Sequence, residues 1–441
     1  MRSDRFVHPV ARAMKLLVLL VSCGLWLAGS ARATDYFVRS SGDDHNLGTS
    51  PDAAWQSLDR ANQARFGPGD RLLLQGDEKF FGTIRLDAAD SGTAEKPVII
   101  TSFGPVRATI RAGRLPGLLA QNVSGLVVSN LVFEGAGADV NQVDGLLFQN
   151  DLPGSRSLGF IRVDNVDVSG FGGSGLAVPG GRSGSGFRDV VVEGSAFHDN
   201  RKAGIFFWGQ RVGQHEGIRI SRCRAFDNLG DPRSPKNSGS GIVLGNVNGA
   251  LIEECLAWGN GASCRATEGP VGIWTYDSNR VVIQRNESHH NHSGGPADGG
   301  GFDLDQNVTD SVLQANYSHD NDGAGYLLAH APAGGAFRGN IVRFNLSEND
   351  GRKNNYAGID VWGRVTETRI YHNTVVTGAF RGSAPRALRI FNYGLPCIHV
   401  RDHLLSHIRL VTAGGVPGIE DYVRHLRGSP RHRPLRYYVI S

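Results

Sequence analysis

Cysteine is scarce in this chain, with five residues among 441. A small fold held together by disulfides needs a far higher density of cysteine, so that class of protein is excluded. Long apolar runs are equally rare. After residue 33 the sequence contains none that is long enough to cross a bilayer, and we predict no transmembrane segment.

The first 33 residues differ from the rest. A basic start is followed by the apolar run Leu16–Leu27, and Ala31-Arg32-Ala33 supplies the small residues that signal peptidase recognises. We therefore predict that residues 1–33 are a signal peptide and that the protein is secreted or periplasmic. The stretch that ends at Cys23 also resembles a lipoprotein cleavage site, so lipid anchoring through Cys23 is the alternative.

The chain also lacks the positive charge that nucleic-acid binding requires. Its formal net charge is +4, and the signal peptide alone carries five basic residues and one acidic residue. The tail from Arg401 carries seven arginines and three acidic residues, which leaves the body of the chain near −4. Because such a body repels phosphate, we expect no nucleic-acid partner.

What the sequence does contain is a repeat of about thirty residues, together with sixty glycines. In each repeat an aliphatic residue is followed three positions later by a polar or small one. The pairs are Val127 and Asn130, Val192 and Ser195, Ile220 and Cys223, Ile252 and Cys255, Ile283 and Asn286, Leu313 and Asn316, Val342 and Asn345, and Ile370 and Asn373. A second polar row follows: Asn200, Asn228, Asn260, Asn291 and Asn321. Asparagine amides stacked on successive coils hydrogen-bond one another as a ladder.

Each repeat also contains a strand that opens with a small residue and alternates apolar and variable positions, as in Gly204-Ile-Phe-Phe and Gly358-Ile-Asp-Val. Alternate side chains of a strand point to opposite faces, so the first and third residues after the glycine point inward. Coils of this kind bury a continuous core only when they stack on one another. The fold class is therefore predicted to be all-β: a single-stranded right-handed parallel β-helix, which is a solenoid.

The two ends of the chain depart from the repeat. Residues 34–120 are predicted to hold a first strand, an amphipathic helix over residues 53–66 and the first coils, and this helical segment is expected to cap the open end of the solenoid. The β-helix itself is predicted over residues 121–395. Residues 396–441 are basic and non-repetitive, and they are left as a cap, a disordered tail or a frame error.

The outward positions of the glycine-opened strands form two unusual rows. An ordinary solvated face would be rich in Lys, Glu, Ser and Thr, but these rows alternate large aromatic residues with carboxylates and an arginine. Aromatic rings beside polar groups suit sugar rings, so we predict a carbohydrate-binding groove. The alternative is that loops cover these aromatic residues. The residues chosen for substrate binding are Trp208, Trp274, Tyr276, Asp360 and Trp362.

The densest group of carboxylates lies in Gly295–Asp305, with a further aspartate on the next repeat. Asp298 and Asp322 occupy equivalent positions before their strands, and Asp303 and Asp305 point outward from the strand between them. Converging carboxylates need a cation, and all-oxygen ligands favour Ca²⁺. These four aspartates are therefore the predicted metal ligands, with turn capping as the alternative reading.

Two other stacks are candidates for chemistry of a different kind. His289 and His319 are equivalent on adjacent repeats and suit either a transition metal or ring stacking, of which stacking is favoured. Cys223 and Cys255 also stack, and a buried thiol pair is favoured over a disulfide.

The repeat, the asparagine ladder and the segment from Tyr36 to Asp70 resemble the pectate-lyase-like superfamily of right-handed β-helix proteins over roughly residues 34–395. Ala297–Leu304 is loosely similar to the Asp-Asp-Gly-Trp-Asp-Leu segment of calcium-dependent family-nine polysaccharide lyases, although one of the paired aspartates is absent and an extra glycine intervenes. The resemblance implies that Asp298 and Asp303 bind calcium and that a lysine abstracts a proton.

The lysine nearest downstream of this segment is Lys353, which follows Arg352. It is the predicted base, with Arg389 as a second catalytic residue and His319 or Arg389 as substitutes for the base. The resulting hypothesis is β-elimination on an acidic polysaccharide by a monomer that contains calcium. The alternatives are a non-catalytic glycan-binding solenoid and a uronate epimerase or glycoside hydrolase, the last with Asp303 and Asp360 as its paired carboxylates.

Overall fold

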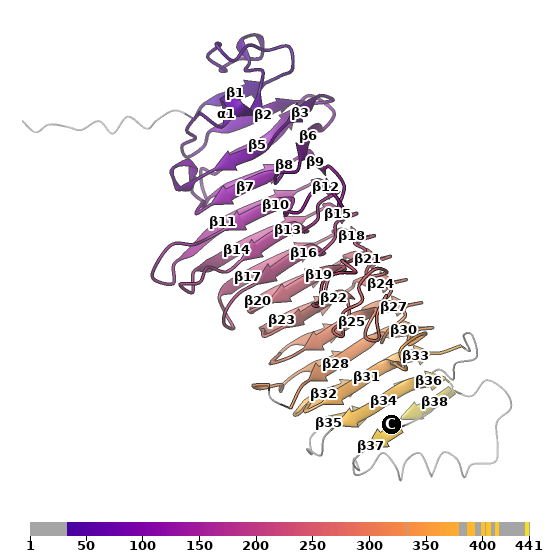
Figure 1. Cartoon of the computed structure of the whole chain (residues 1–441). Helices are drawn as coiled ribbons and strands as arrows, with labels where there is room; N and C mark the ends of the chain where they lie inside the picture. Colours follow the sequence, from indigo (N-terminus) through magenta and orange to yellow (C-terminus); the bar gives the residue numbers. More distant parts are fainter. Residues whose placement is uncertain are drawn as a thin grey trace, which may run out of the picture. The chain divides into compact units, whose positions relative to one another are not determined.

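The computed structural model describes residues 33–332, 334–378, 386–392, 398–401, 403–406, 411–413 and 437–440. In this part of the chain almost all regular structure is β-strand, and the strands form three long sheets in which each coil contributes one strand to each sheet (Figure 1). The predicted signal peptide and Cys23 lie outside the described residues. Among the described residues, no helix has the length and apolar character needed to span a membrane.

The three sheets are named A, B and C. Sheet A contains β1 (Asp35–Val38), β2 (Arg71–Gln75), β5 (Val98–Phe103), β8 (Leu126–Ser129), β11 (Ser157–Asp164), β14 (Gly186–Glu193), β17 (His215–Ser221), β20 (Val247–Glu253), β23 (Asn279–Gln284), β26 (Val312–Gln314), β29 (Ile341–Arg343), β32 (Thr368–Tyr371) and β35 (Ile398–Arg401). Sheet B contains β3 (Lys79–Phe81), β6 (Ala108–Gly113), β9 (Leu131–Gly135), β12 (Asp167–Ser169), β15 (Ala196–His198), β18 (Arg224–Phe226), β21 (Leu256–Trp258), β24 (Glu287–His289), β27 (Tyr317–His319), β30 (Leu346–Glu348), β33 (Thr374–Val376), β36 (His403–Ser406) and β38 (Tyr437–Ile440).

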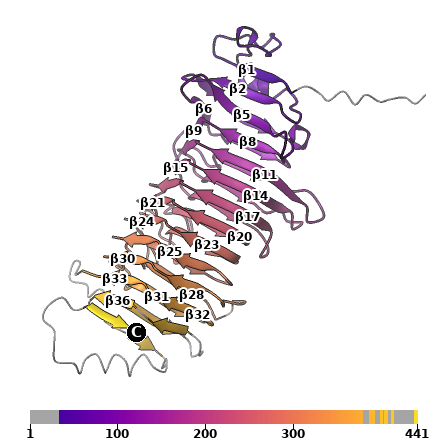
Figure 2. The ribbon, with the colours of Figure 1, turned by 180° about the vertical axis from the view of Figure 1, so that it is seen from behind.

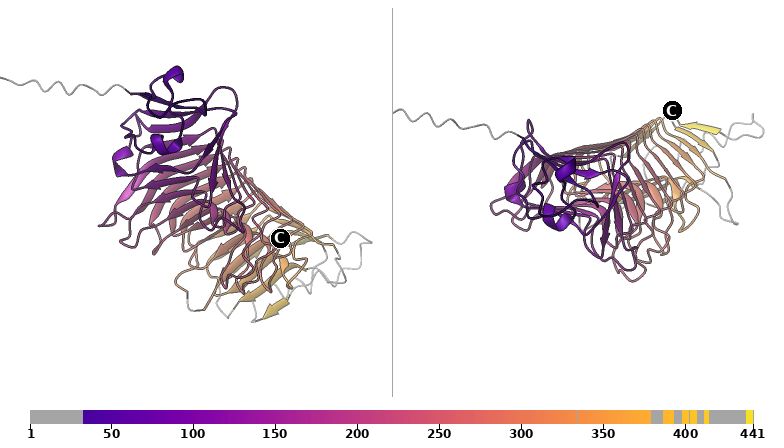
Figure 3. Two further views of the ribbon diagram at one scale, coloured as in Figure 1. Left: turned by 45° about the horizontal axis from the view of Figure 1, so that its top comes forward. Right: turned by 90° about the horizontal axis from the view of Figure 1, so that it is seen from above.

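Sheet C consists of the predicted glycine-opened strands and their extensions. It contains β4 (Ile84–Leu86), β7 (Leu118–Gln121), β10 (Leu146–Gln149), β13 (Ser174–Pro179), β16 (Ala203–Trp208), β19 (Ser240–Gly245), β22 (Val271–Tyr276), β25 (Gly300–Asp305), β28 (Tyr326–His330), β31 (Ala357–Gly363), β34 (Arg386–Asn392) and β37 (Val411–Ala413). Neighbouring strands are parallel throughout the described sheets, apart from β36 and β38. The solenoid prediction is therefore confirmed, and Figures 2 and 3 show the coils following one another in chain order.

The core fills the space between the three sheets, because alternate side chains of each strand point inward. Ile205 and Phe207 on β16, and Phe302 and Leu304 on β25, are fully buried in one continuous apolar cluster. The inward assignment of the first and third residues after each glycine is confirmed at these strands.

A sharp bend joins sheet A to sheet B in each coil. It uses one residue in the left-handed region, for example Arg285, Ala315 and Phe344 with φ near +55°. This conformation is uncommon for residues with a side chain. The next residue then points inward, and in the later coils it is an asparagine.

The asparagine ladder is present at this bend. Asn286 Nδ2 donates to Asn316 Oδ1 at 3.0 Å, Asn316 Nδ2 to Asn345 Oδ1 at 3.1 Å, and Asn345 Nδ2 to Asn373 Oδ1 at 2.9 Å. Each of these oxygens also accepts the main-chain N–H of the preceding ladder residue. The predicted inward stack of these four residues is confirmed. Asn130 was assigned one residue out of register, because it occupies the left-handed position with φ +59°.

The second row forms a parallel ladder from Asn228 through Asn260 and Asn291 to Asn321. It ends on an aspartate, since Asn321 Nδ2 donates to Asp350 Oδ1 at 2.8 Å.

The N-terminal segment differs from the prediction. The expected helix over residues 53–66 is wrong: the structure has a 3₁₀ turn, η1 (Pro51–Ala53), and one helical turn, α1 (Leu58–Ala61), while a second 3₁₀ turn, η2, covers Ala88–Asp90. Trp55 instead adds an isolated parallel bridge to Val38, and its ring is buried against the first coils. Backbone pairing of Trp55 with the edge strand β1 is therefore preferred to the helix that the apolar spacing predicts.

The C-terminal tail contains more of the repeat than the sequence indicates. Strands β35, β36 and β37 pair with β32, β33 and β34, so coil pairing continues beyond residue 395. The cysteines of the described chain, Cys223, Cys255 and Cys264, are buried free thiols, which agrees with the favoured reading of the first two.

Replacing the ladder asparagine Asn316 by alanine should lower the free energy of unfolding by about 1–3 kcal/mol, because buried partners on both sides lose a hydrogen bond. Asn316→Asp keeps the shape but cannot donate, and it should also destabilise the fold at neutral pH. Urea unfolding measures both effects. Unchanged stability of both variants would contradict a stabilising role for the ladder.

Candidate functional site

A cleft of about 760 Å³ lies on the outer face of sheet C, over the strands from β22 to β34. Its floor consists of outward side chains of those strands, and its walls come from the loops that enter them. The residues that line it include Glu268, Trp274, Asp298, Asp303, Asp305, Tyr356, Trp362, Arg386, Arg389 and Phe391.

The two outward rows differ in depth. The row formed by the fourth residue after each glycine is half-buried at Tyr276, Asp305 and Trp362, of which Asp305 and Trp362 line the cleft. The row formed by the second residue is buried in its middle, where Trp274 is 9 % exposed and Asp360 is fully buried, and half-buried at its ends, at Phe206 and Arg389. The expectation of two open rows is therefore wrong for the middle of the second row.

Those loops explain the cleft. The chain between a second-ladder asparagine and the next strand glycine is long in three successive coils, from Asn228 to Gly241, Asn260 to Gly272 and Asn291 to Gly301. It is short in the flanking coils, as between Asn200 and Gly204. This difference in loop length is visible in the sequence. It could have indicated that Glu268 lines the cleft and that loops cover part of the second row.

Asp298 lies at the end of the third loop in the left-handed region, with φ +53°, and its carboxylate is held from two sides. Tyr356 Oη donates to Asp298 Oδ1 at 2.8 Å, and the main-chain N–H of Gly269 donates to Oδ2 at 2.8 Å. Burial raises the pKa of Asp298, although both hydrogen bonds act in the opposite direction. Tyr356 was not singled out by the sequence pattern, because it precedes its strand outside the repeat.

Asp303 and Asp305 project from β25 toward the same cleft. Burial is the main cause that raises the pKa of Asp305 to about 7, and the charges of Asp298 and Glu268 add to it. Asp303 is 3 % exposed, and its Oδ1 has no hydrogen-bond partner among the described residues. Burial is the main cause that raises the pKa of Asp303 well above its usual range, and the neighbouring carboxylates add to it.

Asp360, two coils from Asp303, pairs with Arg389, whose Nε lies 2.7 Å from Asp360 Oδ2. Burial raises the pKa of Asp360 to about 6, and the Arg389 charge limits the increase. Arg389 also donates to the carbonyl of Asn355 at 3.0 Å and stacks over the Tyr356 ring. Asp298, Asp303 and Arg389 thus line the same cleft.

Two predicted residues lie elsewhere. Lys353 does not line this cleft among the described residues, and its ammonium donates to the carbonyl of Ser293. Asp322 Oδ2 accepts the N–H of Ser293 at 3.2 Å and lies 3.4 Å from His292 Nδ1. These contacts lower the pKa of Asp322 and are those of a turn.

The four predicted calcium ligands do not form one ligand set in the described chain. The groups of three His, Cys, Asp or Glu side chains there whose donor atoms all lie within 4.8 Å of one another are on sheet B instead. Calcium binding stays a prediction, and no step derived below uses it.

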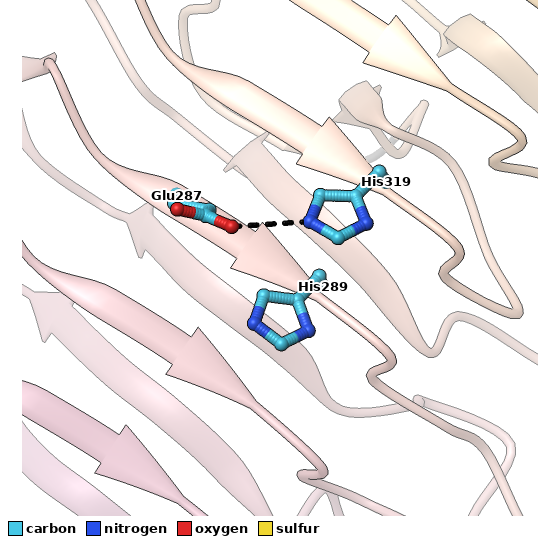
Figure 4. A group of neighbouring side chains, drawn as sticks. All are labelled: Glu287, His289 and His319. Atoms are coloured by element: carbon cyan, nitrogen blue, oxygen red, sulfur yellow. Dashed lines mark hydrogen bonds and ion pairs between the residues drawn. The ribbon is translucent and has the colours of Figure 1, made fainter.

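One of those groups consists of Glu287, His289 and His319 (Figure 4). Glu287 Oε1 lies 3.1 Å from His319 Nε2, and the two histidine rings stack with centroids 4.6 Å apart and planes 15° apart. An imidazole binds a metal in its own plane, so two nearly parallel stacked rings have no shared metal position. Ring stacking, the favoured reading, describes this pair.

Trp208 lies at the far end of the predicted groove. A second hollow of about 770 Å³ adjoins the cleft there, and the two share Asn237, Glu268, Trp274, Asp305 and Gln306 in their linings. The groove expected from Trp208 to Arg389 is therefore matched by two adjoining hollows along sheet C.

Comparison with curated proteins shows similarity to a lacto-N-biosidase of Bifidobacterium longum subsp. longum. The two are 24% identical over 460 residues, which cover 79% of this chain. The matched region is 28% of the length of that relative.

Solved structures share the fold. The GH136 lacto-N-biosidase of Eubacterium ramulus is similar with a TM-score of 0.57 and 18% identity, over 83% of this chain and 68% of that one. The A-module of mannuronan C-5 epimerase AlgE6 of Azotobacter vinelandii is similar with a TM-score of 0.56 and 14% identity, over 79% of this chain and 88% of that one.

A family model described as a right-handed β-helix region matches residues 152–295 and 262–375, which together are half of the chain. The matched span includes both ladders and the coils from β13 to β33. This chain therefore belongs to the family of right-handed β-helix proteins.

Proposed function

We propose that the protein is a glycoside hydrolase that cleaves a glycan bound in the cleft over β22–β34. The observation that carries the proposal is the pair formed by Asp305, a half-buried carboxyl with a pKa of about 7, and Asp298, a carboxylate fixed by Tyr356 and Gly269. Glycoside hydrolysis needs one carboxyl that is protonated at neutral pH and a second that is ionised.

In this proposal Asp305 donates its proton to the glycosidic oxygen as the bond to the leaving sugar breaks. Asp298 acts on the opposite side, either as the nucleophile or as the base that activates water. Tyr356 holds Asp298 in one orientation, and its hydrogen bond favours the ionised form of that carboxylate. The raised pKa of Asp303 favours its neutral form, which limits the negative charge beside Asp298.

Relatives support this choice without deciding it. The curated relative and one structural neighbour are named lacto-N-biosidases, and a biosidase hydrolyses glycosidic bonds. The hydrolase hypothesis from the sequence paired Asp303 with Asp360. Asp305 and Asp298 replace that pair here, because Asp360 does not line the cleft and is bound to Arg389, while Asp303 is only 3 % exposed at the cleft floor.

A second candidate is action on uronates by elimination or epimerisation, as the name of the epimerase neighbour suggests for that protein. Arg386 and Arg389 at one end of the cleft favour it, because a cationic group neutralises the carboxylate on which charge accumulates. With Lys353 outside the lining, we assign the base of such a reaction to no lysine. Export of the protein, calcium binding and a monomeric state remain proposals from the sequence.

Asp305→Asn should lower kcat by about 10²-fold or more, because the amide cannot supply a proton. The assay measures new reducing ends on an aryl lacto-N-bioside, pectate, alginate and glycosaminoglycans. Asp310→Asn changes an exposed aspartate that does not line the cleft; it is the matched control and should retain full activity. Products that carry an ultraviolet-absorbing double bond would instead establish elimination, and binding without any product would establish a non-catalytic solenoid.

The rate of glycan hydrolysis should show a bell-shaped dependence on pH. It requires Asp305 protonated, so activity should fall as the pH rises through about 7, the pKa of Asp305. It also requires Asp298 ionised, which sets the acid limb.

Tyr356→Phe removes a hydrogen bond that lowers the pKa of Asp298, so the acid limb should move to higher pH while the alkaline limb stays in place. A pH–rate profile of this variant beside the wild type measures both limbs. A shift of the alkaline limb alone would contradict the assignment of Asp298.

A further inference from the structure

The second hollow lies beside the cleft, at the end of the groove that contains β16. Its floor is formed by Phe206 and Trp208, whose ring centroids are 4.6 Å apart, and by Tyr276, whose ring lies against Gly245. A Cβ atom at Gly245 would come within 2.3 Å of the Tyr276 ring, so the absence of a side chain there lets the aromatic floor continue toward the cleft.

Lys202 stands over this floor. Its Nζ lies 4.9 Å from the Phe206 ring centroid and 4.6 Å from that of Trp208. The side chain is half-buried, and it forms no ion pair in the part of the chain that the structure describes. Removing a charge from water without an anionic partner is costly. Burial accordingly lowers the pKa of Lys202, and Asp144 opposes the decrease.

The hollow is also lined by the carboxylates Asp231, Glu268, Asp277 and Asp305, of which Glu268 and Asp305 are shared with the cleft. Arg201 pairs with Asp139, and Arg233 Nε lies 3.1 Å from Asp231 Oδ1. Asp144 is the carboxylate whose charge acts on the pKa of Lys202. It accepts the main-chain N–H of Ser174 and does not line the hollow. Lys202 is therefore the cation that the aromatic floor presents to a ligand, with exposed Lys236 beside it.

The strand register gives the separation between Asp305 and Trp208, the ring beside which Lys202 lies. Trp208, Gly245, Tyr276 and Asp305 occupy the same row on β16, β19, β22 and β25. Three strand spacings make that separation about 14 Å. A single sugar does not span it, whereas a short oligosaccharide laid along the shared lining does.

We propose that Lys202, with Phe206 and Trp208, forms a subsite for an anionic sugar, in which the ammonium binds a uronate carboxylate or a sulfate ester and the rings stack on the sugar face. The inference rests on the proposed function, because it places this subsite several sugars away from the bond that Asp305 and Asp298 act on. It gives the substrate class as a glycan with a negatively charged unit at that distance.

Binding of defined oligosaccharides to the Asp305→Asn protein tests the subsite apart from catalysis. The carboxylate probe is a galacturonate hexasaccharide, compared with its carboxyl-reduced form. The sulfate probe is a carrageenan-derived hexasaccharide, compared with its desulfated form. Calorimetry in low and high salt gives the affinity for each. In the Asp305→Asn background, Lys202→Gln should weaken binding of the preferred anionic probe about tenfold and make that binding less dependent on salt. Lys202→Arg should restore both the affinity and its salt dependence.

The matched control is Lys79→Gln, an exposed lysine on β3, which should bind as the parent does. The melting temperature of each variant checks that it is folded. Neutral probes should bind equally to the parent and to Lys202→Gln. The subsite is refuted if the parent prefers neither anionic probe to its neutral form, or if Lys202→Gln binds them as the parent does. Selective binding that depends on Lys202, without hydrolysis by the wild type, would keep the subsite and reject the proposed function.

Discussion

Main-chain pairing between successive coils is the constraint on which the whole structure depends. Parallel strands in register place equivalent side chains about 4.8 Å apart along each row. A residue type that suits one coil is therefore repeated in the next, which gives the apolar core and the two amide ladders. Asn286, Asn316 and Asn345 are satisfied only because each has a partner at that spacing on both sides.

The same spacing brings charged side chains together where the repeat is broken. Asp303 lies beside Trp274 on one neighbouring strand and Leu327 on the other, so it is deprived of water without gaining an ion pair. Burial of this kind favours the protonated form of a carboxyl. Long loops in three successive coils complete the enclosure, and Tyr356 and Gly269 donate hydrogen bonds to Asp298 that act against the effect of burial on its pKa. In the proposed function this difference in surroundings assigns Asp305 as the acid and Asp298 as its ionised partner.

The periodic part of the fold could be predicted from the sequence, because glycine-opened strands and stacked asparagines report the local backbone directly. The exceptions have physical causes. Asn130 follows an aliphatic residue at the expected spacing but takes the left-handed position instead of the inward one. Trp55 pairs at a sheet edge where a helical pattern was expected.

The candidate site was only partly predictable. Asp298, Asp303, Asp305 and Arg389 stand out as charged residues within or beside an apolar repeat, and the structure places all four in one cleft. The depth of each row depends on loops that have no repeat, so the burial of Asp360 could not be read from alternation. The partner of Lys353 and the role of Tyr356 likewise depend on how two loops pack.

The central claim is that Asp305 holds a proton near neutral pH while an adjacent carboxylate is available to act with it. A carbon-13 NMR titration of aspartate carboxyl groups in the intact protein measures this directly. The account predicts one resonance that titrates near pH 7 and that is absent from Asp305→Asn. If Asp305 instead titrates at about 4, as ordinary exposed aspartates do, the account is contradicted.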